Sequence, residues 1–383
     1  MSAPMVQVLV GDLFKSNAQT LVNTVNTVGV MGKGVALSFK QRFPGMFEDY
    51  FRRCQLKEVR LGRPYLYRNV APPNIINFPT KDHWRGVSRL SDIVAGLKYL
   101  EANIGEWGVT SLAVPPLGCG EGQLEWRVVG KTLYRHLVRL NIPVQLFAPF
   151  GTPDEEMRPE FLEEPTVAAS SVGHHHNGDG SKPAFRVEPG WLALVAILER
   201  ISRENYHWPI GRVGFQKVAY FATEAGIPTQ LVHERKSYGP YAPGMKQVLS
   251  RLTNNGLIVE RQLGKMIATT IGPTYVDAKK TYEGYLHEWQ PKIDAVAELL
   301  ARMNTDDAEI AATVHFAAKQ VALAQRRKPT ETEVLRYVMD WKKRRRPPLN
   351  EVDVALAIRG LNMLGWLEAE PDELPVSEDL MIA

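Results

Sequence analysis

The chain has 383 residues, of which 44% are hydrophobic, so one to three domains with sizeable cores are expected. Its formal net charge of +4 allows contact with nucleic acid without requiring it. The two cysteines stand in no metal-binding spacing, and we find neither a signal peptide nor an apolar run long enough to span a bilayer. We therefore expect a soluble, cytoplasmic protein without a disulfide framework and without a membrane partner.

In the first 155 residues, short apolar runs alternate with stretches of helical apolar spacing. Pro79 is expected to end its strand, and Ser91 to cap the helix that follows. The alternation predicts an α/β sandwich whose ligands lie beyond the carboxyl ends of the strands. We predict strands at 5–10, 20–22, 64–67, 74–78, 111–114 and 144–147, and helices at 35–43, 46–54, 91–104 and 126–140.

Two glycine-rich loops, 23–34 and 115–122, each connect a predicted strand to a predicted helix. Glycine lets a backbone approach a ligand closely, and the amides at a helix start favour an anion. Two such loops could hold both phosphates of a diphosphate. The glycine spacing fits neither the dinucleotide fingerprint nor the Walker loop, and a tight strand-to-helix turn is the alternative interpretation of the first loop.

The composition changes after residue 150, and residues 156–184 have the pattern of a flexible linker. This segment contains three adjacent histidines, His174, His175 and His176. No acidic or cysteine ligands surround them, so we interpret them as solvated linker residues and predict no metal site.

Residues 185–383 are predicted to form a second, mainly helical domain. A basic run, Lys342–Arg346, is either a solvated helix face or a DNA contact, and the tail from Glu351 onward is acidic. The helices followed by a hairpin suggest a winged helix. We predict helices at 191–202, 215–224, 244–254, 275–302, 307–325, 332–341 and 351–364, with hairpin strands at 257–261 and 266–270 joined by a turn at 263–265.

The N-terminal part resembles macrodomains, the ADP-ribose-binding α/β/α module. The similarity is carried by residues 11–13, by the Asn-Thr-Val-Asn run at 23–26 with its glycines, and by residues 116–124. The run at 23–34 and the Phe-Pro-Thr-Lys segment at 78–81 resemble more narrowly the hydrolase branch that includes the terminal ADP-ribose glycohydrolase and the bacterial antitoxin DarG. The resemblance implies a three-layer α/β/α macrodomain with a mixed sheet at 1–155, followed by a winged-helix-like domain.

The resemblance also implies roles for individual residues. Asp12 would bind the adenine amino group, Asn23 would orient the distal ribose, and Lys81 would stand at the anomeric carbon, which makes Lys81 and Asn23 the expected catalytic pair. No cofactor is implied. The ligand-binding set expected from the family pattern is Asp12, Leu13, Asn23, Thr24, Asn26, Gly32, Lys33, Gly34, Val35, Thr80, Pro116, Leu117, Gly118, Cys119, Gly120, Glu121 and Gly122.

Lys81 is the residue on which the predicted chemistry depends. Cleavage of an N-glycosidic bond needs stabilisation of an oxocarbenium-like carbon and protonation of the leaving base. A desolvated lysine amine can act as nucleophile or as proton donor. Lys81 follows a strand between Pro79 and Trp84, so its backbone should be well fixed. The alternative interpretation is an ordinary surface lysine in a loop, without a catalytic role. His83 is the rival acid–base group, although a lone loop histidine is more often structural.

One position departs from the family pattern. The protein-directed member of that branch, the terminal ADP-ribose glycohydrolase, carries an aspartate where this chain has Gly122, so both a covalent lysyl intermediate and direct hydrolysis stay open here. Trp84 and Arg85, with Arg89 nearby, could hold a DNA strand by stacking and phosphate contact, or could form a solvated surface.

The function implied by the resemblance is that of a bifunctional antitoxin. Its macrodomain would remove ADP-ribose from thymidine in single-stranded DNA, and residues 185–383 would bind a DarT-like ADP-ribosyltransferase toxin. Two alternatives remain open: a module that only binds ADP-ribose, and a winged-helix regulator that binds duplex DNA.

Overall fold

The computed structural model describes residues 5–163, 187–263 and 266–375, which form two compact units. The first unit contains residues up to Glu188 together with Ser250–Val259 and Gly272–Gly284, and the second contains the rest. The three adjacent histidines, most of the predicted linker and the tip of the predicted hairpin turn lie outside the described residues. None of the helices in the described part is both long and apolar enough to cross a membrane.

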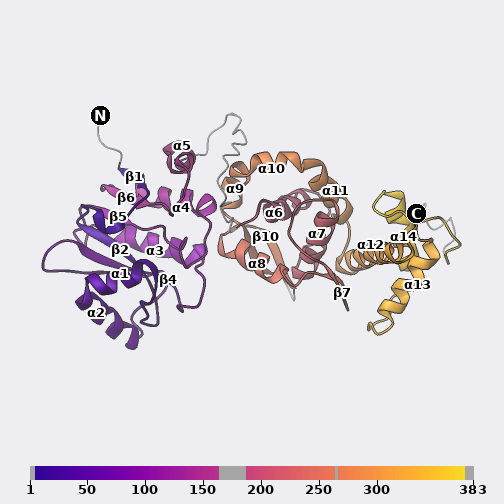
Figure 1. The fold of residues 1–383 in the computed structure, drawn as a ribbon, viewed down its shortest axis with the longest axis horizontal. Helices are drawn as coiled ribbons and strands as arrows, with labels where there is room; N and C mark the ends of the chain where they lie inside the picture. The colour runs from indigo at the N-terminus through magenta and orange to yellow at the C-terminus, as the bar shows by residue number, and fades with distance from the viewer. Residues whose placement is uncertain (1–4, 164–186, 264–265, 376–383) are drawn as a thin grey trace. The chain divides into compact units, whose positions relative to one another are not determined.

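The described part of the first unit is built around a mixed sheet of six strands (Figure 1). Their order is β1-β6-β5-β2-β4-β3, and β3 alone among them runs antiparallel to its neighbour. The strands are β1 Val6–Leu9, β2 Thr20–Asn26, β3 Tyr65–Tyr67, β4 Asn74–Lys81, β5 Leu112–Val114 and β6 Val144–Phe147.

Helices cover both faces of this sheet, which gives the expected three layers. On one face, Phe39 of α1 and Tyr50 of α2 join Leu21 and Val25 of β2 in a buried core. The apolar face of α3 and α4 packs on the other side of the sheet, where Gly96 of α3 lies against the Phe78 ring. The helices are α1 Gly34–Arg42, α2 Pro44–Gln55, α3 Leu90–Asn103, α4 Trp126–Val138 and α5 Pro159–Glu163, with the short 3-10 turns η1 Leu13–Lys15 and η2 Asp154–Met157.

Two local predictions in this unit are wrong. Strand β4 continues through Pro79 to Lys81. β3 pairs only with Ile75–Asn77, so at Pro79 β4 has a neighbouring strand on one side only. A proline, which lacks an N–H, is tolerated at such a position. Helix α3 begins at Leu90 rather than after Ser91, and Arg89 occupies the capping position without a side-chain cap in the described structure. The segment expected to be linker also begins with order, since η2 and α5 reach into it.

Two later segments belong to the first unit and are held to it by polar contacts. The backbone N–H of Glu125 donates to Asn255 Oδ1 at 2.7 Å, at the start of α4. Arg135 of α4 makes a two-pronged ion pair with Asp277, both N–O distances being 2.8 Å. The chain therefore returns to the macrodomain-like unit far from it in sequence.

The second unit is mainly helical, as predicted. Its buried centre joins α7 and α12, where the Tyr220 hydroxyl lies 2.8 Å from His315 Nδ1. Backbone pairing between Gly211 and Ala268 adds to the β9–β10 sheet in the order expected of a winged helix, an interpretation that stays a prediction. The elements after residue 188 are α6 Pro189–Ser202, α7 Arg212–Glu224, β7 Glu234–Lys236, β8 Gly239–Tyr241, α8 Met245–Asn254, β9 Ile258–Leu263, β10 Met266–Ile271, α9 Tyr275–Thr281, α10 Glu283–Glu288, α11 Gln290–Leu300, α12 Thr305–Gln325, α13 Glu331–Lys342 and α14 Glu351–Met363.

The basic run that starts at the last residue of α13 is not a uniform solvated face. Lys342 is buried, with Nζ 2.8 Å from Glu309 Oε1 of α12 and 2.6 Å from the Ser237 carbonyl oxygen. Arg345 also turns inward, with Nη2 3.0 Å from Asp306 Oδ1. Two of the five cations therefore hold the helices of this unit together, because a buried carboxylate needs compensating charge.

Candidate functional site

A cleft of about 860 Å³ opens at the carboxyl ends of β2 and β4, within the range of small-molecule sites. Both glycine-rich loops and Lys81 border it, as the sequence predicted. It is lined by Thr24, Val25, Asn26, Val30, Gly32, Lys33, Gly34, Val35, Ala36, Thr80, Lys81, Trp84, Pro115, Pro116, Gly118, Gly120, Glu121, Gly122, Gln123 and Arg251.

The first glycine-rich loop ends in a helix start that faces the cleft. Lys33 precedes α1 and makes no capping hydrogen bond through its side chain in the described structure, and the first turn carries no acidic residue. The backbone N–H groups of this turn are therefore available to an anion, and the helix dipole favours one there. Gly34 has φ +57°, a conformation that side chains rarely adopt, which explains its glycine.

Asn26 shapes that loop from the end of β2. Its Oδ1 accepts hydrogen bonds from the N–H groups of Val28 at 3.0 Å and Val30 at 3.2 Å, and its Nδ2 donates to the Val30 carbonyl at 2.5 Å. The Tyr50 hydroxyl also donates to Asn26 Oδ1 at 3.1 Å. Asn26 therefore fixes the loop wall as well as lining the cleft.

The second glycine-rich loop folds back on itself. The N–H of Leu124 donates to the Gly118 carbonyl at 2.9 Å, and that of Gln123 to the Gly120 carbonyl at 3.1 Å. These turns bring Gly118, Gly120 and Gly122 to the cleft. Leu117 and Cys119 alternate with them and are buried in the core, so these two predicted ligand contacts are absent from the lining that the structure describes.

Lys81 stands at the end of β4 between the two loops. Its Nζ donates to the carbonyl oxygens of Glu121 at 3.2 Å and Gly86 at 3.4 Å. Burial lowers the pKa of the Lys81 ammonium below its usual range, and the Glu121 carboxylate offsets part of that shift. An amine with a lowered pKa, held by backbone rather than by a carboxylate, is suited to nucleophilic or proton-transfer chemistry.

Asn23 is absent from the cleft lining that the structure describes, so its predicted role at the distal ribose stays a prediction. Asn23 is fully buried, and its Nδ2 donates to Asn77 Oδ1 at 2.9 Å, while Asn77 Nδ2 donates to the Tyr65 hydroxyl at 3.1 Å. Side chains alternate along β2, so Asn23 shares the face of Leu21 and Val25 that packs under α1 and α2. The asparagine that meets the cleft is Asn26.

Asp12 and Leu13 also lie outside the cleft lining that the structure describes. The Asp12 carboxylate caps η1 by accepting from the Phe14 N–H at 3.0 Å. Leu13 is 5% exposed and belongs to the core under the sheet. The predicted adenine contact therefore stays a prediction.

Trp84 lines the cleft and is 44% exposed, with the Arg85 guanidinium 4.5 Å from its ring centroid. The His83 ring stacks on Trp84, with centroids 5.5 Å apart, and His83 Nδ1 accepts from the Arg85 N–H at 3.2 Å. The stacked group leaves His83 outside the described lining and weakens its candidacy as an acid–base residue. The predicted contact of Trp84 and Arg85 with a DNA strand stays a prediction.

Arg251 is the lining residue that sequence analysis missed. It belongs to the later segment that returns to the first unit. No pattern within the first 155 residues points to it, because its place depends on the contacts of Asn255 and Asp277 described above. It adds a guanidinium to the described lining.

The sequence of this chain is similar to those of known proteins. Residues 22–133 match the Macro domain family. The ADP-ribose glycohydrolase OARD1 of Bos taurus is 30% identical over 124 residues, which are 31% of this chain and 75% of that protein. The chain belongs to the macrodomain family. The matched range begins within β2 and ends within α4.

Two bacterial relatives extend the similarity beyond the macrodomain. The DNA ADP-ribosyl glycohydrolase of Thermus aquaticus is 37% identical over 252 residues, 65% of this chain and 64% of that protein. A DNA ADP-ribosyl transferase–DNA ADP-ribosyl glycohydrolase fusion protein of Thermosipho africanus is 40% identical over 172 residues, 40% of this chain and 44% of that protein. The chain thus matches less than two thirds of the length of either relative.

Proposed function

We propose that this protein is a DNA ADP-ribosyl glycohydrolase that releases ADP-ribose from thymidine in single-stranded DNA. The main observation behind the proposal is the position of the Lys81 amine. It is partly buried at the end of β4, between the first turn of α1 and the second glycine-rich loop. The similarity to relatives named for this activity supports it. The α1 turn and the second glycine-rich loop would hold the diphosphate, so that the distal ribose meets Lys81.

Glycosidic bonds are usually cleaved by a pair of carboxyl groups, but Glu121 is the sole carboxylate among the described lining residues. Lys81 is therefore the candidate for the chemical step. The neutral amine can attack the anomeric carbon as the bond to the base breaks, or the ammonium can protonate the leaving base. The lowered pKa of Lys81 makes the two routes distinguishable. If the neutral amine reacts, kcat rises with pH through that lowered pKa, and if the ammonium donates a proton, kcat falls over the same range.

The test uses ADP-ribosylated oligonucleotide, Lys81→Met and, as a matched control, Lys33→Met, which removes a second amine from the same cleft. We expect Lys81→Met to lose ADP-ribose release while it keeps ADP-ribose affinity in calorimetry. Lys33→Met should weaken affinity and retain kcat. Wild-type turnover by Lys81→Met would refute the assignment, and an oligonucleotide left intact by the wild-type protein would show a module that only binds ADP-ribose.

We further propose that residues 185–383 bind the transferase that writes the modification. Fusion of a transferase and a glycohydrolase in the Thermosipho africanus relative supports a physical link between the two activities. The first turn of α14 is acidic and contains Glu351 and Asp353. Its negative charge would be attracted to the positively charged groove in which a transferase binds nucleic acid. Inhibition of the transferase by full-length Lys81→Met would separate binding from hydrolysis, and unchanged transferase activity would contradict the proposal.

A duplex-binding regulator is less well supported. Lys342 and Arg345 of the basic run pair with Glu309 and Asp306, so they are committed to the helices of the second unit. Salt-sensitive, sequence-selective binding to duplex DNA would be needed to revive this alternative.

A further inference from the structure

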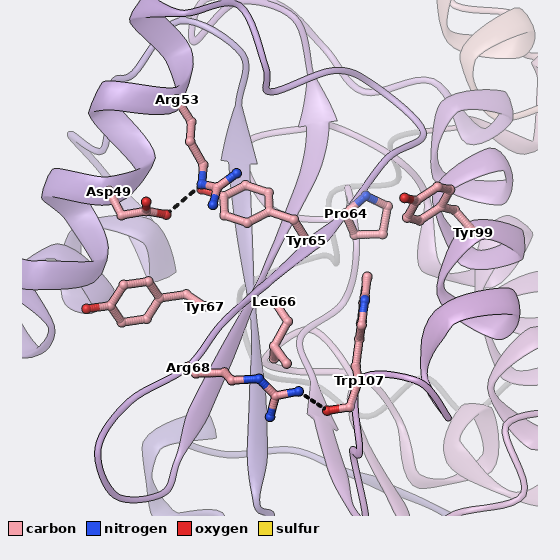
Figure 2. Close-up of a pocket in the computed structure, with 9 residues that line it drawn as sticks. All are labelled: Asp49, Arg53, Pro64, Tyr65, Leu66, Tyr67, Arg68, Tyr99 and Trp107. Atoms are coloured by element: carbon pink, nitrogen blue, oxygen red, sulfur yellow. Dashed lines mark hydrogen bonds and ion pairs between the residues drawn. The ribbon is translucent and has the colours of Figure 1, made fainter.

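A second groove, of about 480 Å³, runs along the edge strand β3 of the macrodomain (Figure 2). One wall comes from α2, which contributes Asp49 and Arg53, and the other from Tyr99 of α3 and Trp107 beyond it. β3 forms the floor, and Figure 2 shows the Tyr65 and Tyr67 side chains directed toward the α2 wall. This groove shares no residue with the cleft that contains Lys81.

Planar groups dominate the groove. The Arg53 guanidinium lies 4.7 Å from the centre of the Tyr65 ring, and the Tyr99 and Trp107 rings have centroids 6.3 Å apart. Arg68 Nη2 donates to the Trp107 carbonyl at 2.8 Å, which holds its guanidinium beside the ring-bearing wall. Aromatic rings and guanidinium planes are the surfaces on which unpaired bases stack, without preference for one base.

The chain around the groove is strongly basic. Residues 52–68 contain a single acidic residue, Glu58, against six basic ones: Arg52, Arg53, Lys57, Arg60, Arg63 and Arg68. All six except Arg53, which is half-buried, are exposed. Asp49 is already paired with Arg52 and Arg53, at 2.8 Å in each case, so its carboxylate does not leave the surface anionic. A positive surface with stacking rings complements a single strand of nucleic acid.

The basic turn that leads into β3 lies toward the cleft. Tyr65 is in register with Asn77, four residues before Lys81 on β4. At about 3.3 Å per residue, the end of the groove at Tyr65 is therefore roughly 13 Å from Lys81, measured along the strands. A strand leaving the cleft needs only a few nucleotides to reach the turn formed by Arg60 and Arg63 and then the groove.

We propose that this groove and its basic turn bind the single-stranded DNA that flanks the modified nucleotide. The inference rests on the proposed function and deepens it. The cleft recognises the ADP-ribose, and the β3 groove supplies affinity for the strand that carries it. Because the contacts are stacking and phosphate contacts, the site favours single strands over duplexes and does not read sequence.

The test compares two substrates for the full chain: an ADP-ribosylated oligonucleotide with long flanks and an ADP-ribosylated mononucleotide. Arg68→Glu combined with Tyr99→Ala alters the groove and leaves the cleft unchanged. Arg139→Glu is the control, because it is an exposed arginine at the end of α4, which leads to β6 and not to β3. We expect KM for the long substrate to rise roughly tenfold in the groove variant, with kcat unchanged, as expected for the loss of one stacked base.

The mononucleotide should be hydrolysed equally by the wild type, the groove variant and Arg139→Glu. Anisotropy with an unmodified oligonucleotide gives a reading independent of catalysis, and its salt dependence should weaken by roughly 0.7 in slope for each phosphate contact removed. Equal oligonucleotide affinity in the wild type and the groove variant would overturn the inference and leave β3 as an edge for an extended peptide. Failure of the wild type to release ADP-ribose from either substrate would instead count against the proposed function alone.

Discussion

Gly122 offers the sharpest test of how the second glycine-rich loop holds its ligand. A Cβ at this position would lie 2.3 Å from Ser88 Oγ and 2.4 Å from the Gly118 carbonyl oxygen, where real Cβ atoms keep at least 3.0 Å. The serine could rotate away, but the Gly118 carbonyl accepts the Leu124 N–H and belongs to the turn itself. Gly122→Ala must therefore move the cradle by several tenths of an ångström or more.

We expect Gly122→Ala to destabilise the macrodomain by about 2 kcal/mol, a typical cost of overpacking. ADP-ribose affinity should fall roughly 100-fold, because a cradle displaced on the ångström scale no longer meets the phosphate oxygens. Gly122→Asp should be worse still, since it adds a negative charge beside the diphosphate. The aspartate of the protein-directed relative therefore cannot simply be restored here.

Thermal unfolding and calorimetry with ADP-ribose measure both effects. Gly120→Ala is the matched control: no described atom lies within 4 Å of the Cβ it would add, and its backbone is not in the left-handed region. Gly120→Ala should therefore fold with the stability of the wild type. Wild-type melting temperature and affinity in Gly122→Ala would show that the loop yields freely and would refute the reasoning.

Three further predictions concern groups that the structure buries. Lys342→Met should cost about 3 kcal/mol in urea unfolding, because Glu309 loses its 2.8 Å partner, and a loss below about 1 kcal/mol would contradict a structural role. Burial lowers the pKa of His315 from 6.5 to about 4, so this residue contributes stability above pH 6.5 that is lost as pH falls toward 4. That contribution is about 3 kcal/mol, and stability measured against pH should show the decline flattened in His315→Phe. Asn26→Ala should lower ADP-ribose affinity at least about tenfold by releasing the loop, whereas Asn23→Ala should lower stability but not affinity. Equal affinities in calorimetry would contradict the distinction between the two asparagines.

The sequence predicted the strands, most helices and the two glycine-rich loops because these features depend on local pattern. Apolar alternation and glycine positions are read along the chain, and parallel strands bring their carboxyl ends to one edge of a sheet. Lys81 was placed in this way. The sequence did not show that Asn26, and not Asn23, lies in the described lining of the cleft, because successive side chains along β2 point to opposite faces and the motif alone does not give the strand's phase.

Residues that act through distant contacts escaped the sequence analysis. Arg251 lines the cleft only because Asn255 and Asp277 attach their segments to α4. Lys342 looked like part of a solvated basic run and is instead paired inside the second unit, since the charge that neutralises it comes from Glu309 on another helix. Such pairings depend on which elements pack together.

Local backbone features of this chain follow from its sequence, whereas the surroundings of individual side chains follow from the tertiary structure. The amino-acid order by itself determined the strand–loop–helix units and the backbone cradles, because backbone conformation is governed by short-range sterics and hydrogen bonding. Only the tertiary structure decided that Gly122 admits no side chain, that Asn23 is core and that β3 carries a basic, ring-lined groove. Each of these depends on what lies within a few ångströms in space, and residues far apart in the chain supply those neighbours.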